Sequence, residues 1–224
     1  MVQIKAVVFD LDGTLLDSKI NFGEMSRCVK SILLSFGIPE EHLTERHQVY
    51  RFILGWESAF VDYGFDDQVL GKVLDEMNEA INKVELDAVR FVKRMPNAYD
   101  TLNKLKEMGL LIGVATRGSY MYSTQSLEIT ELDKFVNVLL ARDQVRFPKP
   151  DPRHLLSVIE KLNVALGETI YVGDTVTDYT TAFKAGVSFY AYKRDETRVK
   201  RLIEAGCKCF IQDLYEIPEI IGQL

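Results

Sequence analysis

Residues 4–14 read IKAVVFDLDGT, a short apolar run that ends in two acidic residues, a glycine and a threonine. Apolar side chains that continue over 4–9 without strict alternation predict a strand buried on both faces. Such strands belong to parallel sheets that helices cover on both sides. The carboxylates of Asp10 and Asp12 therefore follow the carboxyl end of the first strand.

Five further apolar runs repeat this design, each ending in a polar or glycine-rich turn before a segment with helical spacing. They span residues 110–115, 136–140, 169–172, 187–191 and 207–211. Strands that alternate with helices in this way predict an α/β fold with a doubly wound, Rossmann-like parallel sheet. Two helices have clear ends. Asp151 caps one that begins with proline and runs to 163, and Thr177 caps another that ends near 185, before Gly186.

Residues 18–93 break this alternation, because they carry apolar positions at helical spacing with no strand between them. Three helices are expected, over 25–36, 45–60 and 66–84. The alternation of strand-like apolar runs with helical segments resumes after Pro96. We therefore expect a helical cap at 18–93, inserted into an α/β core made of residues 1–17 and 94–224.

The composition is that of a globular protein, with 47% apolar and 27% charged residues. The 27 basic and 33 acidic side chains leave a formal net charge of −6, so we expect no nucleic-acid partner. No apolar run is long enough to cross a membrane, and Asp10 comes too early for a signal peptide. A cytoplasmic protein without a membrane partner is the expectation.

Asp10 and Asp12 stand two residues apart at a strand end and can face one site. Apposed carboxylates repel each other, so the pair needs a cation, a shared proton or exposure to water. A solvated acidic turn would show the same pattern. What stands at the ends of the other strands decides between these alternatives.

Thr116 ends the second strand, and Lys149 lies between two prolines just before a helix. A hydroxyl, the charge of the neighbouring Arg117 and a lysine ammonium all bind phosphate oxygens well. Each residue also has a plainer interpretation, because Thr116 suits a turn and Lys149 could be a surface residue in a proline-stiffened loop.

The fourth strand ends at Gly173 and Asp174, and Asp178 follows one helical turn later. Carboxylate oxygens suit Mg²⁺, which needs few protein ligands and keeps waters that a substrate displaces. Asp178 is alternatively a stabilising charge at a helix N-terminus. In a doubly wound sheet, ligands bind outside the carboxyl ends of the strands. Asp10, Thr116 and Asp174 all stand at such ends, which favours one shared site.

Together, the motifs at Asp10 to Thr14, Thr116, Lys149 and Asp174 resemble those of the haloacid dehalogenase-like hydrolase superfamily. The similarity is greatest to its phosphoglycolate phosphatase-like branch, which has a helical cap after the first motif. The resemblance spans nearly the whole chain. It implies a phosphoric monoester hydrolase with a sheet of strand order 3-2-1-4-5.

The resemblance also implies a role for each residue. Asp10 is the nucleophile that accepts the phosphoryl group, and Asp12 serves as general acid and then as general base. Thr116, Arg117 and Lys149 hold the phosphoryl group. Dehalogenases of the superfamily lack the second aspartate, so Asp12 argues for phosphate chemistry.

Mg²⁺ is the cofactor implied by the resemblance, bound by Asp10, Asp174 and the backbone carbonyl of Asp12, with Asp178 as a partner of these ligands. The implied reaction is hydrolysis of a small phosphomonoester through an aspartyl-phosphate, with phosphoglycolate as the leading candidate. A phosphomutase uses the same residues and stays open. A receiver-like signalling module also gathers Asp, Thr and Lys around Mg²⁺, but its phosphorylated Asp lies on a later strand and it lacks a helical insertion.

Substrate choice is expected to fall to the cap, whose sequence follows no simple chemical rule. Arg51, Trp56 and Glu57 are the candidates for contacts to the leaving group. A solvated charge and a cap-core residue are the plainer interpretations of Arg51 and Trp56. Arg117 stands where the family commonly has a small or amide residue and could select an anionic leaving group. The expected partner is a small phosphorylated metabolite, and the sequence leaves the oligomeric state open.

Overall fold

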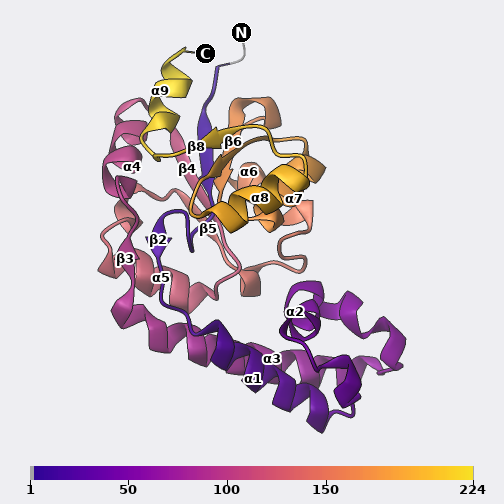
Figure 1. The fold of residues 1–224 in the computed structure, drawn as a ribbon. Coiled ribbons are helices and arrows are strands. Elements are labelled where there is room, and N and C mark those ends of the chain that lie inside the picture. The colour runs from indigo at the N-terminus through magenta and orange to yellow at the C-terminus, as the bar shows by residue number, and fades with distance from the viewer. Residues whose placement is uncertain (1–2, 224) are drawn as a thin grey trace. The chain divides into compact units, whose positions relative to one another are not determined.

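The computed structural model describes residues 3–223, apart from the side chains of residues 46–47, 50 and 54–58 (Figure 1). The chain forms two compact units. The larger consists of Met1–Ser18 and Phe91–Leu224, and the smaller of Lys19–Arg90. Each unit has its own hydrophobic core.

A six-stranded parallel sheet forms the centre of the larger unit. Its strands follow the order β5 (Val138–Leu140), β4 (Leu111–Ala115), β1 (Ala6–Phe9), β6 (Thr169–Gly173), β7 (Ser188–Tyr192) and β8 (Phe210–Ile211). Numbered along the chain, the first five strands of this sheet have the order 3-2-1-4-5, which confirms the predicted doubly wound fold. The sixth apolar run, predicted over 207–211, forms a strand only in its last two residues, beside β7.

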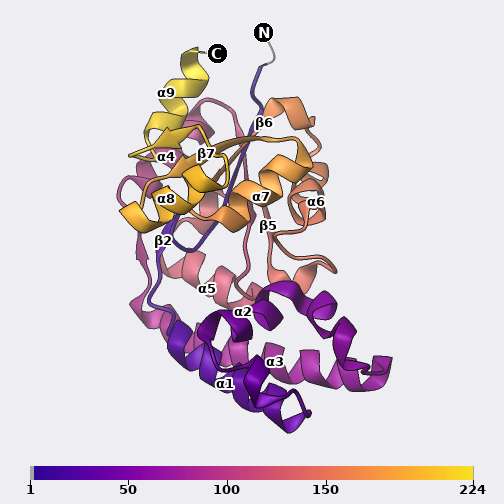
Figure 2. The same ribbon diagram turned by 45° about the vertical axis from the view of Figure 1, so that its right-hand side comes forward.

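Helices cover both faces of the sheet (Figures 1 and 2). One face carries a pair that pack on each other, α6 (Pro152–Leu162) and α7 (Val176–Ala185). The other face carries a second such pair, α4 (Ala98–Glu107) and α9 (Glu216–Gln223). Two more helices follow β4 and β7, namely α5 (Tyr120–Ile129) and α8 (Glu196–Glu204). Among the described residues, no helix combines the length and apolar character needed to cross a membrane.

The ends of α6 and α7 explain how the chain places residues beside the sheet. Asp151 caps α6 by accepting a hydrogen bond from a backbone amide in its first turn, as predicted, and Asn163 ends it in the left-handed conformation. The predicted cap of α7 was wrong, because Thr175 rather than Thr177 occupies that position. The Thr175 hydroxyl accepts from the Asp178 amide, while the Asp178 carboxylate accepts from the Thr175 amide. This exchange satisfies two amides at once and starts the helix earlier.

The smaller unit is built from α1 (Phe22–Ser35), α2 (Arg46–Gly55) and α3 (Asp67–Ala88), with short 3₁₀ helices at Glu40–His42 and Trp56–Tyr63. The helix predicted over 45–60 is therefore divided. Its α-helical part ends at Gly55, since glycine is a poor residue for a helix interior. The buried side chains that hold the unit together include Val29, Leu33, Phe52, Met77 and Ile81.

A second, two-stranded sheet in the larger unit joins β2 (Leu16–Asp17) to β3 (Lys93–Arg94) in antiparallel fashion. Leu16 pairs with Arg94, and Asp17 with Lys93. The chain leaves the larger unit soon after β2 and returns to it shortly before β3. Both connections to the smaller unit therefore start from one hydrogen-bonded pair of strands.

Candidate active site

Asp10 follows directly on β1, and its backbone amide donates to the Val172 carbonyl at 2.9 Å, which continues the pairing of β1 with β6. The Asp10 side chain is 10% exposed. Burial raises the pKa of Asp10 to about 7, and the charge of Asp178 adds to this effect, while Lys149 opposes it. The end of β1 thus holds a carboxylate whose ionisation is unfavourable unless a cation lies nearby.

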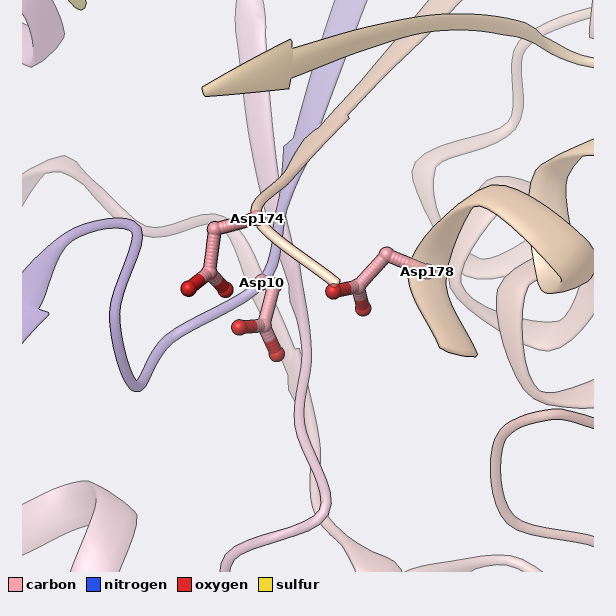
Figure 3. Close-up of side chains that lie close together, drawn as sticks. All are labelled: Asp10, Asp174 and Asp178. Atoms are coloured by element: carbon pink, nitrogen blue, oxygen red, sulfur yellow. The ribbon is translucent and has the colours of Figure 1, made fainter. Parts of the chain in front are cut away.

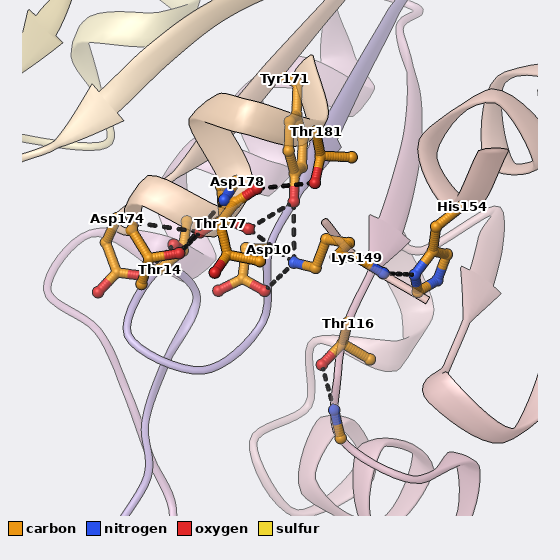
Figure 4. Close-up of polar contacts among 12 residues, drawn as sticks. Asp10, Thr14, Thr116, Lys149, His154, Tyr171, Asp174, Thr177, Asp178 and Thr181 are labelled. Carbon is orange, nitrogen blue, oxygen red and sulfur yellow. Dashed lines mark hydrogen bonds and ion pairs between the residues drawn. The ribbon is translucent and has the colours of Figure 1, made fainter. Parts of the chain in front are cut away.

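Lys149 supplies a cation at this point (Figure 4). Its Nζ donates to Asp10 Oδ1 at 2.6 Å, to Asp178 Oδ1 at 2.7 Å and to the Tyr171 hydroxyl at 2.9 Å. The Lys149 side chain is 1% exposed. Burial alone would lower the pKa of Lys149, but the two carboxylates raise it, so the ammonium stays charged. The interpretation of Lys149 as a surface residue is therefore wrong.

His154, on the first turn of α6, holds the backbone of Lys149. Its Nδ1 accepts a hydrogen bond from the Lys149 amide at 3.2 Å, and its Nε2 lies 3.0 Å from the Leu140 carbonyl. These partners require a neutral ring with its proton on Nε2. Burial and the nearby Lys149 charge lower the pKa of His154 to about 4, which agrees with that state. Sequence analysis missed His154, because a lone histidine on a helix carries no signal of its own.

Asp178 uses both of its oxygens within the protein. The Tyr171 hydroxyl and Lys149 donate to Oδ1, while the amide and hydroxyl of Thr175 donate to Oδ2 at 3.1 and 2.5 Å. Burial alone would raise the pKa of Asp178, but the charge and hydrogen bond of Lys149, with these further donors, lower it. Asp178 is therefore an ionised anchor for Lys149. Gly173 makes the approach possible, since a Cβ there would lie 2.5 Å from the Asp178 Cβ.

Asp174, at the end of β6, is fully buried. The Thr14 hydroxyl donates to its Oδ1 at 3.5 Å, and the Arg198 guanidinium of α8 pairs with its Oδ2. Gly13 lies against this carboxylate with a φ of +94°, and a Cβ there would come within 2.5 Å of Asp174 Oδ2. Arg198 is a further residue that sequence analysis missed, since it lies on a helix far along the chain.

Three carboxylates converge where β1, β6 and α7 meet (Figure 3). Asp10, Asp174 and Asp178 each offer an oxygen, and these oxygens all lie within 4.8 Å of one another. Hard oxygen donors at this spacing fit a small divalent cation such as Mg²⁺. Because both Asp178 oxygens already accept hydrogen bonds within the protein, Asp10 and Asp174 are the side chains best suited to bind the metal directly.

The Asp12 side chain takes a different direction. Its Oδ1 accepts a hydrogen bond from the Tyr122 hydroxyl at 2.5 Å. Tyr122 lies on α5 and is fully buried. Burial, followed by the charge of Asp12, raises the pKa of Tyr122, so this hydroxyl remains a donor. Tyr122 was not found from the sequence, because an aromatic residue on a helix reads as ordinary core.

Thr116 and Arg117 stand in the turn after β4. Thr116 is 1% exposed, and its hydroxyl accepts a hydrogen bond from the Gly118 amide at 3.0 Å. This contact within the turn leaves the hydroxyl hydrogen for another acceptor. The buried Arg142 donates to the Arg117 carbonyl at 2.6 Å and thereby fixes the turn from the side of β5. Sequence analysis did not identify Arg142.

The three cap residues proposed for substrate selection lie in the smaller unit. The side chains of Trp56 and Glu57 fall outside the described residues. Arg51 is exposed and donates to the Tyr63 hydroxyl at 2.9 Å. It lines a hollow of about 370 Å³ in this unit, together with His42, Gln48, Asp62 and Tyr63.

Comparisons with known proteins show which family the chain resembles. The family model of the haloacid dehalogenase-like hydrolases matches residues 7–192. A phosphoglycolate phosphatase of Pseudomonas putida is 30% identical over 82% of this chain and 67% of its own length. The pyrophosphatase PpaX of Bacillus mycoides is 28% identical over 85% of this chain and 84% of its own. The crystal structure of a hydrolase from Pseudomonas syringae superposes with a TM-score of 0.66 at 21% identity, covering 98% of this chain and 99% of that one.

Proposed function

This chain belongs to the haloacid dehalogenase-like hydrolases, and we propose that it is a phosphatase in which Asp10 takes the phosphoryl group of a small phosphomonoester and passes it to water. The observation that carries this proposal is the buried Lys149 ammonium bound to both Asp10 and Asp178. An anionic phosphoester repels a carboxylate nucleophile. A buried cation beside that carboxylate offsets the repulsion where the reaction takes place.

Mg²⁺ is the cofactor of the proposed reaction, held by the side chains of Asp10 and Asp174 and by the backbone carbonyl of Asp12. When bound, it supplies Lewis-acid stabilisation of charge on the phosphoryl oxygens. Around Asp10, the carboxylates outnumber the cationic groups, which leaves negative charge for a metal ion to balance. Asp178 keeps Lys149 charged and in place.

The reaction has two halves. First, an Asp10 oxygen attacks phosphorus, the bond from phosphorus to the leaving oxygen breaks, and Asp12 gives its proton to that oxygen. Then Asp12, now a carboxylate, takes a proton from water, and the water oxygen displaces the Asp10 oxygen from phosphorus. Thr116, Arg117 and Lys149 hold the phosphoryl group during both halves.

Phosphoglycolate is the first substrate to test, and pyrophosphate the second. Arg117 supports both choices, because a cationic side chain beside the phosphoryl site favours a leaving group that carries its own negative charge. The names of two relatives, a phosphoglycolate phosphatase and a pyrophosphatase, point to the same two compounds. Both belong to the class of small phosphorylated metabolites.

Two measurements test the proposed function. Phosphate release is compared across phosphoglycolate, sugar phosphates, nucleotides and pyrophosphate, and we expect a phosphomonoester or pyrophosphate to be hydrolysed with Mg²⁺ present. Rapid acid quenching followed by peptide mass spectrometry should then find one phosphoryl group on Asp10. Transfer to a sugar without phosphate release would show a phosphomutase instead, and a phosphoryl group on another residue would contradict the role of Asp10.

A further inference from the structure

Arg142 holds two consecutive carbonyl groups of the turn after β4. It is 4% exposed and begins a short 3₁₀ helix, Arg142–Gln144, that follows β5. Its guanidinium donates to the Arg117 carbonyl at 2.6 Å, and its backbone amide donates to the Gly118 carbonyl at 3.1 Å. Both donors belong to the segment after the neighbouring strand, so the turn is held from outside.

The peptide unit between Arg117 and Gly118 transmits this hold to Thr116. A trans peptide is planar, so its carbonyl and its amide point to opposite sides. The carbonyl accepts from Arg142, and the amide donates to the Thr116 hydroxyl oxygen at 3.0 Å (Figure 4). Rotation of this plane would break both hydrogen bonds. The direction of the Gly118 amide therefore depends on Arg142.

The backbone at Gly118 passes directly against α5. A Cβ there would lie 2.8 Å from Tyr122 Cδ1 and 3.2 Å from Cε1. Asp143, the residue after Arg142, contacts the same helix, because its Oδ1 accepts from the Tyr120 amide at 2.8 Å. The segment after β5 thus binds both the turn and the start of α5, which leaves the turn little room to shift.

These contacts orient the Thr116 side chain. The Thr116 amide donates to the Leu140 carbonyl at 3.1 Å, which fixes its backbone beside β5. The direction of the hydroxyl group is then the remaining variable. Because the hydroxyl oxygen accepts from Gly118, the hydroxyl hydrogen must point away from that amide, where a phosphoryl oxygen can accept it.

We infer that Arg142 is a positioning residue for phosphoryl binding, which fixes the peptide unit after Arg117 so that the Thr116 hydroxyl donates to a phosphoryl oxygen. Arg142 acts through the turn and does not touch the substrate. The inference rests on the proposed function, in which Thr116 holds the phosphoryl group.

Inhibition by inorganic phosphate, the product of the proposed reaction, tests this role. Arg142→Met keeps an unbranched chain and removes the donors. With p-nitrophenyl phosphate as substrate and Mg²⁺ present, we expect the inhibition constant of phosphate to rise about tenfold, because a hydrogen bond to a charged group is weakened. Arg142→Lys can still donate to the Arg117 carbonyl and should raise it less than about threefold. The constant does not depend on how much of the protein is folded.

Thr116→Val decides whether Arg142 acts through the hydroxyl. Valine keeps the branched shape, and loss of the hydroxyl should raise the inhibition constant about tenfold. With no hydroxyl to direct, adding Arg142→Met should raise it less than about threefold further. A cation that attracts phosphate directly, or a residue that only supports the fold, would cause the full loss again. Arg146→Met, at an exposed arginine of the same connection, is the control and should leave inhibition unchanged.

A second measurement is independent of the proposed function. Hydrogen exchange of the Gly118 amide, followed by NMR in the protein without phosphate, should be at least about tenfold faster in Arg142→Met than in the wild type. The Val114 amide of β4 is the internal reference, so a general loss of stability cancels in the ratio of the two rates.

Unchanged phosphate inhibition in Arg142→Met, a full second loss in the Thr116→Val background, or unchanged Gly118 exchange would overturn the role of Arg142. The proposed function fails in a different way: phosphate would not inhibit the wild type and Asp10 would carry no phosphoryl group, while Gly118 exchange would still respond to Arg142→Met. The two failures are therefore distinguishable.

Discussion

At the scale of single residues, the proposed reaction depends on the carboxylate of Asp10. Asp10→Asn keeps the shape of the side chain and an oxygen that can accept from Lys149, but removes the proposed nucleophile. We expect phosphate release to fall more than about a thousandfold, at least about 4 kcal/mol in the barrier, with the melting temperature nearly unchanged. Asp75→Asn, an exposed substitution on α3, is the control. Activity within about tenfold of the wild type would rule out Asp10 as nucleophile.

The same residues predict a metal requirement. We expect a chelator to abolish turnover and added Mg²⁺ to restore it, while Ca²⁺ substitutes poorly because its larger, looser coordination misplaces the reacting atoms. The metal-free protein should stay folded, since Arg198 balances the charge of Asp174. Circular dichroism checks folding, and calorimetric titration with Mg²⁺ should show weaker binding by Asp174→Asn. Full turnover in excess chelator after exhaustive metal removal is the contrary result.

At the scale of elements, the loop before α6 depends on an uncharged histidine. The pKa of His154 is lowered from 6.5 to about 4, so the unfolded chain takes up this proton first as the pH falls. The free energy of unfolding is therefore unaffected by His154 above pH 6.5 and falls as the pH drops from 6.5 towards 4, because the unfolded chain binds the proton more tightly. Asn in its place can accept from the Lys149 amide without titrating.

Between pH 7 and pH 5, the wild type should lose about 2 kcal/mol more unfolding free energy than His154→Asn. Urea unfolding at the two pH values measures this difference. Using the difference between two proteins cancels the opposite contribution of Asp10, whose raised pKa stabilises the fold as the pH falls. His42→Asn, at an exposed histidine, is the control and should behave as the wild type. Equal losses in all three proteins would show that His154 does not govern this pH dependence.

At the scale of the whole molecule, we propose that the smaller unit, residues 19–90, governs substrate choice while the larger unit carries the chemistry. Arg51→Ala should change the ranking of phosphomonoesters by about tenfold and leave p-nitrophenyl phosphate, which needs little help from the protein, nearly unaffected. Lys72→Ala, another exposed cation of this unit, is the control. Equal loss on every substrate would remove Arg51 from substrate selection, and a ranking changed only by Arg117→Ala would move selection to the larger unit.

The sequence by itself determined the parallel sheet, together with the alignment of Asp10 and Asp174 at its edge. The physical reason is local: apolar runs of strand length become buried strands, and the residues that follow parallel strands meet at one end. The resemblance of the motifs added the strand order and the family. The same local reasoning misplaced the cap of α7, where Thr175 and Thr177 compete and only the reciprocal bond with Asp178 decides.

Only the tertiary structure decided which side chains act on one another. Lys149 meets Asp10 across 139 residues, and Tyr122 meets Asp12 across 110. Neither a loop lysine nor a helical tyrosine has a periodic signature, because its role depends on the burial and direction that packing imposes. The same packing sets the pKa of Asp10, since burial and neighbouring charges exist only after the strands and helices have come together.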